Sequence, residues 1–392
     1  MKKKILYIVT SKTNMGDLAL CLSWIRDLGR KNYSYSFVLD PDLVPYISSL
    51  DSYLTFDKDR DIRKTILEAV DQFAAEAIIF ATNSFWNLPG HNSCKFGKFV
   101  LNKEDVSIPV FSFDPFESGF NHIMPQSGHI IPFSAVPDWV YALRYMSIPP
   151  LTANARHFFA ESVYNKSTLI DPARVISKWE GKTGMKTIFY PLSKDRFYFI
   201  QQHYPNYFGY LGEIFSELAA DRIQVLTILP EKIPEFEALE NVIILPPIPY
   251  EDFLSLINAS DLYLTDSFIS CIVESIQLET PAMLLMNSGK NNALLSGSFF
   301  KGGAFPFWVW PYGMYQVCIA FEELFELGHC YGKAEILDKA EVLSSIRKML
   351  FSEQKRAEVI DNCRQWKSER KKNLPTPAMV LDDVFSQHVP GK

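Results

Sequence analysis

Short apolar runs alternate with amphipathic stretches along the whole chain. An apolar run bounded by turn residues is typical of a buried strand, and apolar positions three or four apart are typical of a helix that covers a sheet. The alternation therefore predicts α/β architecture with parallel strands. We expect strands at Lys4–Thr10, Tyr35–Leu39, Ala77–Phe80, Val110–Phe113 and Ile130–Pro132 in the first half, and at Thr187–Tyr190, Gln224–Leu229, Val242–Leu245, Leu262–Thr265 and Met283–Met286 in the second.

The polar, glycine-bearing segment Trp179–Lys186 separates the two series and is typical of a linker. We therefore expect two Rossmann-like domains, residues 1–178 and 186–365, followed by a charged tail, residues 366–392. The apolar segment Val380–Phe385 of this tail is able to pack back on the first domain. The expected helices are Asp17–Leu28, Ile62–Ala75, Phe208–Ala220, Tyr250–Asn258, Phe268–Leu278, Lys339–Phe351 and Ala357–Lys372.

Composition narrows the function classes. The 392 residues include 39 Lys and Arg against 45 Asp and Glu, so there is no basic excess that would indicate nucleic-acid binding. An aromatic content of 14% excludes global disorder. No apolar stretch is long enough for a transmembrane helix, and the N-terminal run is too short for a signal peptide. The six cysteines form no CxxC pair, which favours a reduced, cytoplasmic protein.

The first candidate site follows the first predicted strand. Gly16 permits a tight turn there, and Asp17 lies in the first turn of the next helix. Open α/β sheets bind ligands at the carboxyl ends of their strands, where a carboxylate can accept a proton from an incoming hydroxyl or amine. The alternative is that Asp17 only caps the helix.

The second candidate site follows the strand Leu262–Thr265, where Asp266 and Ser267 lead into a helix. Free backbone N–H groups at a helix N-terminus, together with Ser267 and Ser270, can bind phosphate. Glu274 is placed to accept hydrogen bonds from a ribose diol. The alternative is the solvent-facing side of an ordinary helix, with Ser267 as its cap.

Two loops add polar groups to this second site. The loop after the strand Thr187–Tyr190 carries Ser193, Lys194 and Arg196, and the two cations can neutralise phosphate charge. The loop after the strand Met283–Met286 carries Asn291, whose amide suits sugar hydroxyls.

These residues resemble the GT-B class of glycosyltransferases, which have two Rossmann-like domains facing each other across a cleft. The stretch from Asn241 to Pro281 is similar to the nucleotide-sugar half of that class, with Glu274 at the ribose-binding position. The loop Asn14–Asp17 is similar to the N-x-G-D loop of protein-arginine rhamnosyltransferases and to the S-x-G-D loop of heptosyltransferases, in which the aspartate is the catalytic base. The resemblance implies that Asp17 is the base of an inverting, metal-independent transfer with no cofactor and a nucleotide-diphosphate sugar as co-substrate.

The chain also departs from the signature of this class. Asp266-Ser267-Phe268 stands in place of His-Gly-Gly, and Lys290-Asn291 in place of a closing Asp/Glu-Gln. A sugar-nucleotide epimerase and a non-catalytic nucleotide-binding or scaffold protein therefore remain alternatives. The acceptor stays unidentified; we expect Asn14, Asp114, Glu117 and His129 on its side of the site.

Two further features are interpreted as structural. Asp40-Pro41-Asp42 has the letters of a metal-binding DxD motif, but it follows a strand and contains proline, so we interpret it as a turn. The aromatic segment 299–312 has no helical or strand period. It is compatible with a ligand-stacking loop, a buried loop or the contact of a homodimer.

Overall fold

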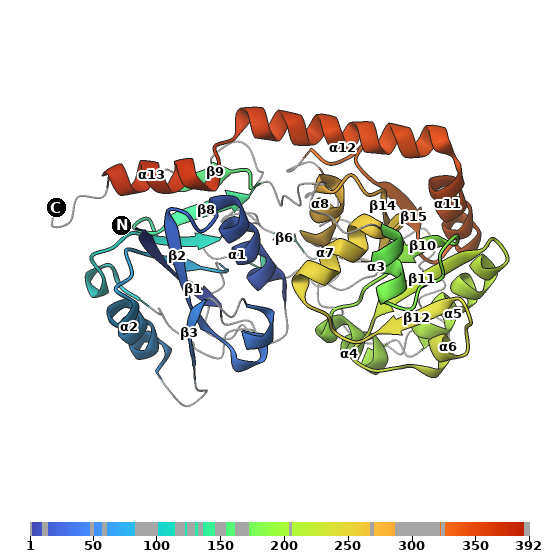
Figure 1. Ribbon diagram of the computed structural model, residues 1–392, viewed down its shortest axis with the longest axis horizontal. Helices are drawn as coiled ribbons and strands as arrows, with labels where there is room; N and C mark the ends of the chain where they lie inside the picture. The colour runs from blue at the N-terminus through green and yellow to red at the C-terminus, as the bar shows by residue number, and fades with distance from the viewer. Residues whose placement is uncertain are drawn as a thin grey trace. The chain divides into compact units, whose positions relative to one another are not determined.

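The structure is a computed structural model, and Figure 1 shows the course of the chain. It describes residues 2–9, 15–47, 51–56, 61–82, 101–113, 122–123, 130–131, 136–145, 154–160, 172–203, 206–266, 270–286, 322 and 326–387. The chain divides into two compact units. Unit 1 contains residues 1–123, 129–162 and 370–392, and unit 2 contains residues 124–128 and 163–369.

Unit 1 is built on a parallel sheet, which has seven strands among the described residues, in the order β3-β2-β1-β4-β5-β8-β9. Register pairs Tyr7 with Phe37 on one side of β1 and with Ile79 on the other. The strands are β1 (Lys3–Val9), β2 (Tyr33–Leu39), β3 (Ser52–Thr55), β4 (Ala77–Phe80), β5 (Val110–Phe113), β8 (Tyr141–Tyr145) and β9 (Ala155–Phe158).

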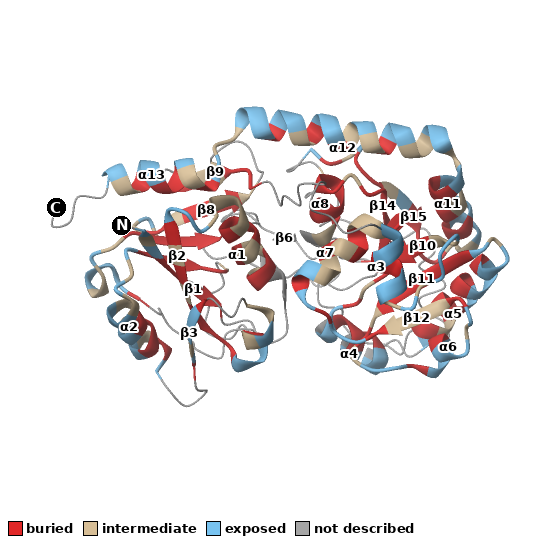
Figure 2. Cartoon of the chain, viewed as in Figure 1, coloured by how far each residue is buried: buried red, intermediate tan, exposed pale blue. Residues whose placement is uncertain are grey.

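Alternate residues of β1 face opposite sides of this sheet and enter two separate cores. Ile5, Tyr7 and Val9 pack beneath α1 (Met15–Leu28), whereas Leu6 and Ile8 pack beneath α2 (Ile62–Phe73). Both faces are covered, as parallel sheets require, and this is why β1 has a continuous apolar sequence. Figure 2 shows that β1 is mostly buried, that α2 is exposed on its outer side, and that α1 carries buried and intermediate residues.

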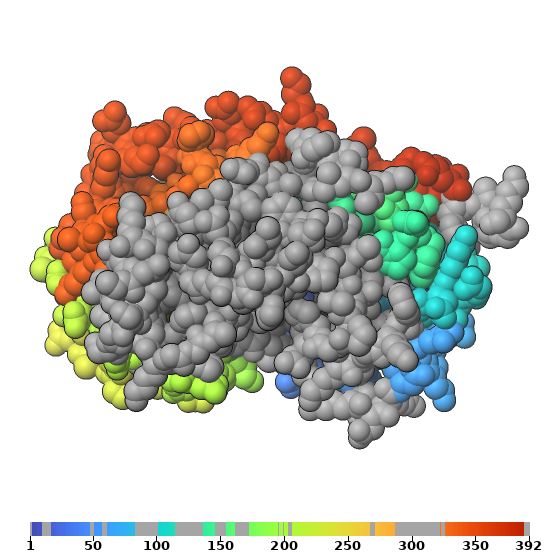
Figure 3. Space-filling view, turned by 180° about the vertical axis from the view of Figure 1, so that it is seen from behind, coloured from blue at the N-terminus to red at the C-terminus, as the bar shows by residue number. Residues whose placement is uncertain are grey.

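The C-terminal helix α13 (Pro377–Gln387) belongs to unit 1. Val380, Leu381 and Val384 are buried in the same core as α1. Lys3 Nζ lies 3.0 Å from an Asp382 carboxylate oxygen. Helix α13 contacts β9, and Figures 1 and 3 both show this C-terminal red segment beside the green segment that carries β9. The apolar segment near residue 380 therefore completes the core of unit 1 from the far end of the chain.

Unit 2 repeats the parallel arrangement with six described strands in the order β12-β11-β10-β13-β14-β15. The strands are β10 (Lys186–Phe189), β11 (Ile223–Ile228), β12 (Val242–Leu245), β13 (Leu262–Thr265), β14 (Ala282–Met286) and β15 (Gly332–Glu335). The helices are α3 (Pro172–Lys178), α4 (Lys194–His203), α5 (Asn206–Ala219), α6 (Pro234–Glu237), α7 (Tyr250–Ala259), α8 (Ser270–Gln277), α11 (Lys339–Phe351) and α12 (Glu353–Asn373).

The helices of unit 2 form two groups, which pack against opposite-facing side chains at the end of β10, those of its last residue Phe189 and of the following residue Tyr190. Phe189 packs against Phe253 of α7, and Tyr190 packs against Phe215 of α5. Helix α7 also contacts α3 and α8, and α5 contacts α6 and α11. The expected α/β fold class is confirmed by two sheets of parallel strands covered by helices.

Several elements differ from the sequence-based expectation. The strand expected at Ile130–Pro132 is absent from the main sheet: β7 (Ile130–Ile131) pairs antiparallel with β6 (His122–Ile123). Strand β8, beside β5, and strand β9, beside β8, were missed, because Arg144, Arg156 and His157 interrupt their apolar pattern. Asp40-Pro41-Asp42 is a turn, as expected: Asp40 Oδ1 accepts a hydrogen bond from Asp42 N at 3.0 Å and caps a short 3-10 helix. Within the described part of the chain, no helix has the length and apolar character needed to cross a membrane.

Replacing Leu381 with Ala tests the contribution of α13 to unit 1. Leu381 is fully buried, so truncation should lower the free energy of unfolding by about 2–5 kcal/mol. Met379→Ala on the same helix is the control, since Met379 is 60% exposed and its loss should leave stability almost unchanged. Urea unfolding measures both variants. Equal losses of stability in the two variants would show that the packing of Leu381 in this core does not stabilise unit 1.

Candidate functional site

Each sheet has one place where the order of strands reverses. In unit 1, β1 lies between β2 and β4, and in unit 2, β10 lies between β11 and β13. The helices that follow two such neighbouring strands lie on opposite faces, so the carboxyl ends of the strands leave room for a ligand. Asp17 follows β1, and Ser193 and Asp266 follow β10 and β13. The sequence-predicted residues that the structure describes therefore gather at these two places.

Asp17 is the third residue of α1 and is partly buried. Burial raises the pKa of its carboxyl group from 3.8 to about 7. The aspartate is therefore poised between its charged and neutral forms near neutral pH. A group with this property can take up and release a proton under physiological conditions.

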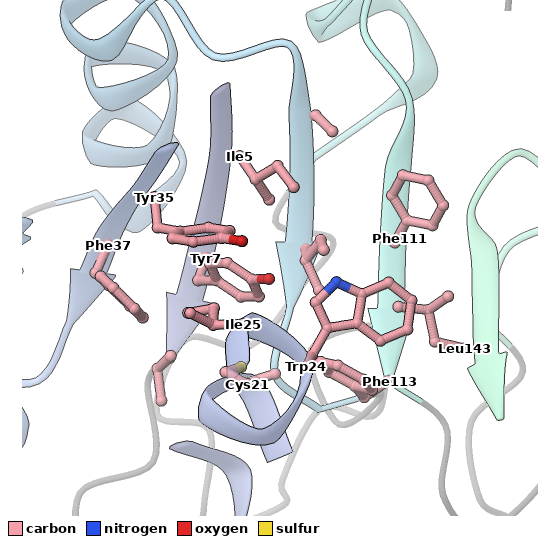
Figure 4. Close-up of a cluster of buried hydrophobic side chains, with 14 of the residues drawn as sticks. Ile5, Tyr7, Cys21, Trp24, Ile25, Tyr35, Phe37, Phe111, Phe113 and Leu143 are labelled. Atoms are coloured by element: carbon pink, nitrogen blue, oxygen red, sulfur yellow. The ribbon is translucent and has the colours of Figure 1, made fainter. Parts of the chain in front are cut away.

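Helix α1 packs on an apolar core, and this core explains the burial of Asp17 in the first turn of the helix. Cys21, one helical turn further, is fully buried, as are Tyr7 of β1 and Trp24. Figure 4 shows Cys21 and Trp24 directed from α1 toward the side chains of the sheet. The Trp24 ring meets Phe158 edge-on, with 4.6 Å between ring centroids. Burial, and then the Asp17 charge, raise the pKa of the Cys21 thiol, which agrees with the closeness of the two residues.

Asp266 is the centre of a buried hydrogen-bond network in unit 2. Its carboxylate accepts hydrogen bonds from Tyr190 Oη at 2.9 Å, from Tyr207 Oη at 2.6 Å and from Arg196 Nε at 2.8 Å. Arg196 Nη2 also donates to the Asp266 carbonyl oxygen at 3.3 Å. Burial, and then the Asp266 charge, raise the pKa of both tyrosines well above the ordinary value, so both remain neutral donors. The network joins the end of β13 to α4 and α5.

This network shows what sequence reasoning missed at this site. Arg196 and Asp266 are brought together, but they bind each other. Tyr190 and Tyr207 were not recognised as partners of Asp266. Tyr207 is 59 positions from Asp266 along the chain, and no local sequence pattern signals a contact over that distance.

Ser193 and Lys194 lie at the start of α4 and are exposed. Ser193 Oγ accepts a hydrogen bond from Arg196 N at 3.4 Å. Arg196 therefore links the Asp266 network to an exposed hydroxyl at the end of β10, and the exposed Lys194 lies next to Ser193 in the chain. These two groups are able to contact an anion.

Glu274 lies on α8 and is buried. Its carboxylate accepts a hydrogen bond from Tyr250 Oη, at the start of α7. Sequence reasoning singled out Glu274 but not Tyr250, which it named only as the start of a helix. The bond connects α8 to the helix that follows β12, so Glu274 also stabilises unit 2.

The remaining predicted site residues lie outside the part that the structure describes. They are Asn14, Asp114, Glu117, His129, Ser267 and Asn291, together with the side chain of Ser270 and the aromatic segment 299–312.

Replacing Arg196 with Ala tests the Asp266 network. The change leaves a buried carboxylate without its cation, which should lower the free energy of unfolding by about 3–5 kcal/mol. Lys232→Ala is the control: Lys232 forms a 3.5 Å ion pair with Glu237, and both side chains are largely exposed, so its removal should cost less than about 1 kcal/mol. Chemical denaturation compares the two. If R196A lowers the free energy of unfolding by less than about 1 kcal/mol, the Arg196–Asp266 ion pair does not stabilise the buried network.

The fold is of the GT-B type and is shared with solved glycosyltransferases. SnogD from Streptomyces nogalater is 12% identical, with a TM-score of 0.55, over 99% of this chain and 100% of its own. The glycotransferase of kitacinnamycin is 10% identical, with a TM-score of 0.57, over 100% of both chains. A UDP-GlcNAc 2-epimerase from Methanocaldococcus jannaschii is also similar, at 11% identity and a TM-score of 0.52, over 92% of this chain and 98% of its own.

At these identities the similarity is one of fold. No curated protein sequence matches the chain. Residues 173–391 match a sequence family described as a family of unknown function, DUF6365. This match covers more than half of the chain, including nearly all of unit 2 and the α13 segment of unit 1. The chain belongs to the DUF6365 family.

Proposed function

We propose that this protein is a glycosyltransferase that uses a nucleotide-diphosphate sugar, with Asp17 as the general base. The observation that carries the proposal is the position of Asp17 after β1, at the strand-order reversal of unit 1, with a pKa raised to about 7. Capping a helix does not require a raised pKa. A general base that takes up a proton near neutral pH works best with a pKa close to that pH.

In this proposal unit 2 binds the donor. Ser193, Lys194 and the N-terminus of α8, with Ser267 and Ser270, hold the diphosphate, Asn291 contacts the sugar, and Glu274 accepts hydrogen bonds from the ribose. Arg196 and Asp266 act differently from our first expectation. Because they bind each other, they position the start of α4 and do not contact phosphate themselves.

The reaction is an in-line displacement. Asp17 takes the proton of the acceptor hydroxyl or amine as that atom forms a bond to the anomeric carbon. The bond between this carbon and the diphosphate oxygen breaks, and its electron pair leaves with the nucleoside diphosphate. The configuration at the anomeric carbon inverts, and the mechanism calls for no metal ion. Asn14, Asp114, Glu117 and His129 are assigned to the acceptor side.

A second candidate is a sugar-nucleotide epimerase, because the fold is shared with the Methanocaldococcus jannaschii enzyme. An epimerase converts the nucleotide sugar without an acceptor. Incubating the protein with a nucleotide sugar alone separates the two activities: an isomeric nucleotide sugar indicates an epimerase, and no change agrees with a transferase.

The donor class is tested by thermal unfolding with UDP-, dTDP- and GDP-linked sugars. A ligand that binds the native state raises the melting temperature, and ligand at 100 times its Kd stabilises by about 2.7 kcal/mol. We expect one nucleotide class to raise the melting temperature and the others to have little effect. If all of them leave the melting temperature unchanged, the protein is a relative that has lost nucleotide binding.

Replacing Asp17 with Asn tests the base. Turnover should fall by about 10²–10⁴-fold while the donor Kd stays the same, because the change removes only proton transfer. In the wild type, activity should fall below about pH 7 as Asp17 becomes protonated. Steady-state rates between pH 5 and pH 9, measured with the donor found above, test both expectations. Wild-type turnover in D17N would exclude the role of Asp17 as base.

A stability measurement on the same variant checks the raised pKa without any substrate. Between about pH 4 and pH 7 the folded wild type holds a proton that the unfolded chain has released, so its stability falls as the pH rises. The substituted asparagine side chain carries no charge in either state. D17N should therefore match the wild type near pH 4 and be more stable above pH 7. Parallel curves would show that the pKa of Asp17 is ordinary.

A further inference from the structure

We propose that Tyr250 is the positioning residue for Glu274 and makes the nucleotide site selective for ribose over 2′-deoxyribose. The inference rests on the proposed function and adds a residue to it. Tyr250 Oη donates a hydrogen bond to Glu274 Oε1, across two helices that follow different strands. Tyr250 touches no ligand in this proposal and acts through the carboxylate.

The Tyr250 ring is fixed from several directions. Tyr250 is the first residue of α7 and is 5% exposed. Pro249 precedes it and restricts the backbone, and the Pro249 carbonyl oxygen accepts a hydrogen bond from Phe253 N at 3.0 Å. The Tyr250 and Phe253 rings are stacked at 13°, and Phe253 meets Phe189 of β10 edge-on. This chain of rings connects the phenol to the sheet.

A fixed phenol restricts the Glu274 carboxylate. A free glutamate side chain must lose rotamer freedom when it binds a ligand, and a carboxylate that is already oriented loses less. An ionised carboxylate has about four acceptor positions, of which the bond from Tyr250 occupies one. In this proposal two others accept hydrogen bonds from the hydroxyls of a ribose. A 2′-deoxyribose offers only one of them, so the benefit of orientation is smaller.

Tyr263 provides a matched comparison on the same side of the sheet. It lies on β13 and is fully buried, and its ring is 6.2 Å from that of Phe189. Burial, then Cys271, and then Glu274 raise the pKa of its phenol, so this hydroxyl also lies near the carboxylate. No hydrogen bond joins Tyr263 to Glu274 among the described residues. Tyr263→Phe therefore removes a buried hydroxyl near Glu274 without removing the bond that orients it.

The test measures dissociation constants by calorimetry for UDP, 2′-deoxy-UDP, GDP, 2′-deoxy-GDP and dTDP. The wild type should prefer a ribonucleotide. Tyr250→Phe should weaken ribonucleotide binding about tenfold and 2′-deoxyribonucleotide binding less than about twofold. Tyr263→Phe should leave both unchanged. Equal losses for ribose and deoxyribose, or the same pattern in Y263F, would overturn the positioning role.

A double-mutant cycle separates action through Glu274 from a general structural effect. Glu274→Gln should abolish the preference for ribose, and adding Tyr250→Phe to it should then change ribonucleotide binding no further. Additive losses would overturn the inference while leaving the proposed function intact. Binding of dTDP alone would exclude selection of ribose. Failure of the wild type to bind any of these nucleotides would overturn the proposed function itself, and the positioning role with it.

Discussion

The buried carboxylate of Asp266 is the interaction on which the arrangement of unit 2 depends. It receives two phenol donors and one guanidinium donor, from residues on three segments of the chain. A carboxylate in this environment is costly to bury unless its acceptor positions are used, so the partners must keep their places. The result is a fixed relation between the ends of β10 and β13 and the start of α4. The exposed residues Ser193 and Lys194 lie at this start of α4.

The two aspartates that follow strands of the two sheets illustrate opposite uses of burial. Asp266 has a buried cation and two phenols as partners, which compensate its charge. Asp17 lies in the first turn of a helix that packs on an apolar core, and burial alone raises its pKa to about 7. The same residue type at the same kind of position in a parallel sheet can thus stabilise a loop or be available for proton transfer, depending on the neighbouring side chains.

The fold accommodates more than one chemistry, since it is shared with glycosyltransferases and with a UDP-GlcNAc 2-epimerase. Function must therefore be argued from individual groups at the strand-order reversals. In this DUF6365 chain unit 2 departs from the His-Gly-Gly signature at Asp266, and the buried hydrogen-bond network gives that departure a structural reason. Asp266, which stands in place of the histidine of His-Gly-Gly, is bound to Arg196.

The sequence by itself determined the fold class and most of the central strands with their covering helices, because buried parallel strands leave apolar patterns that can be recognised locally. It missed strands whose apolar pattern is interrupted by polar residues, such as β8 and β9. It placed Asp17 and Ser193 at the ends of strands and Glu274 inside the helix after β13, as the structure has them. Tertiary structure alone decided that Arg196 binds Asp266, that Tyr250 holds Glu274 and that α13 completes unit 1. These contacts join residues 24 to several hundred positions apart, and their energies depend on burial that only the folded chain creates.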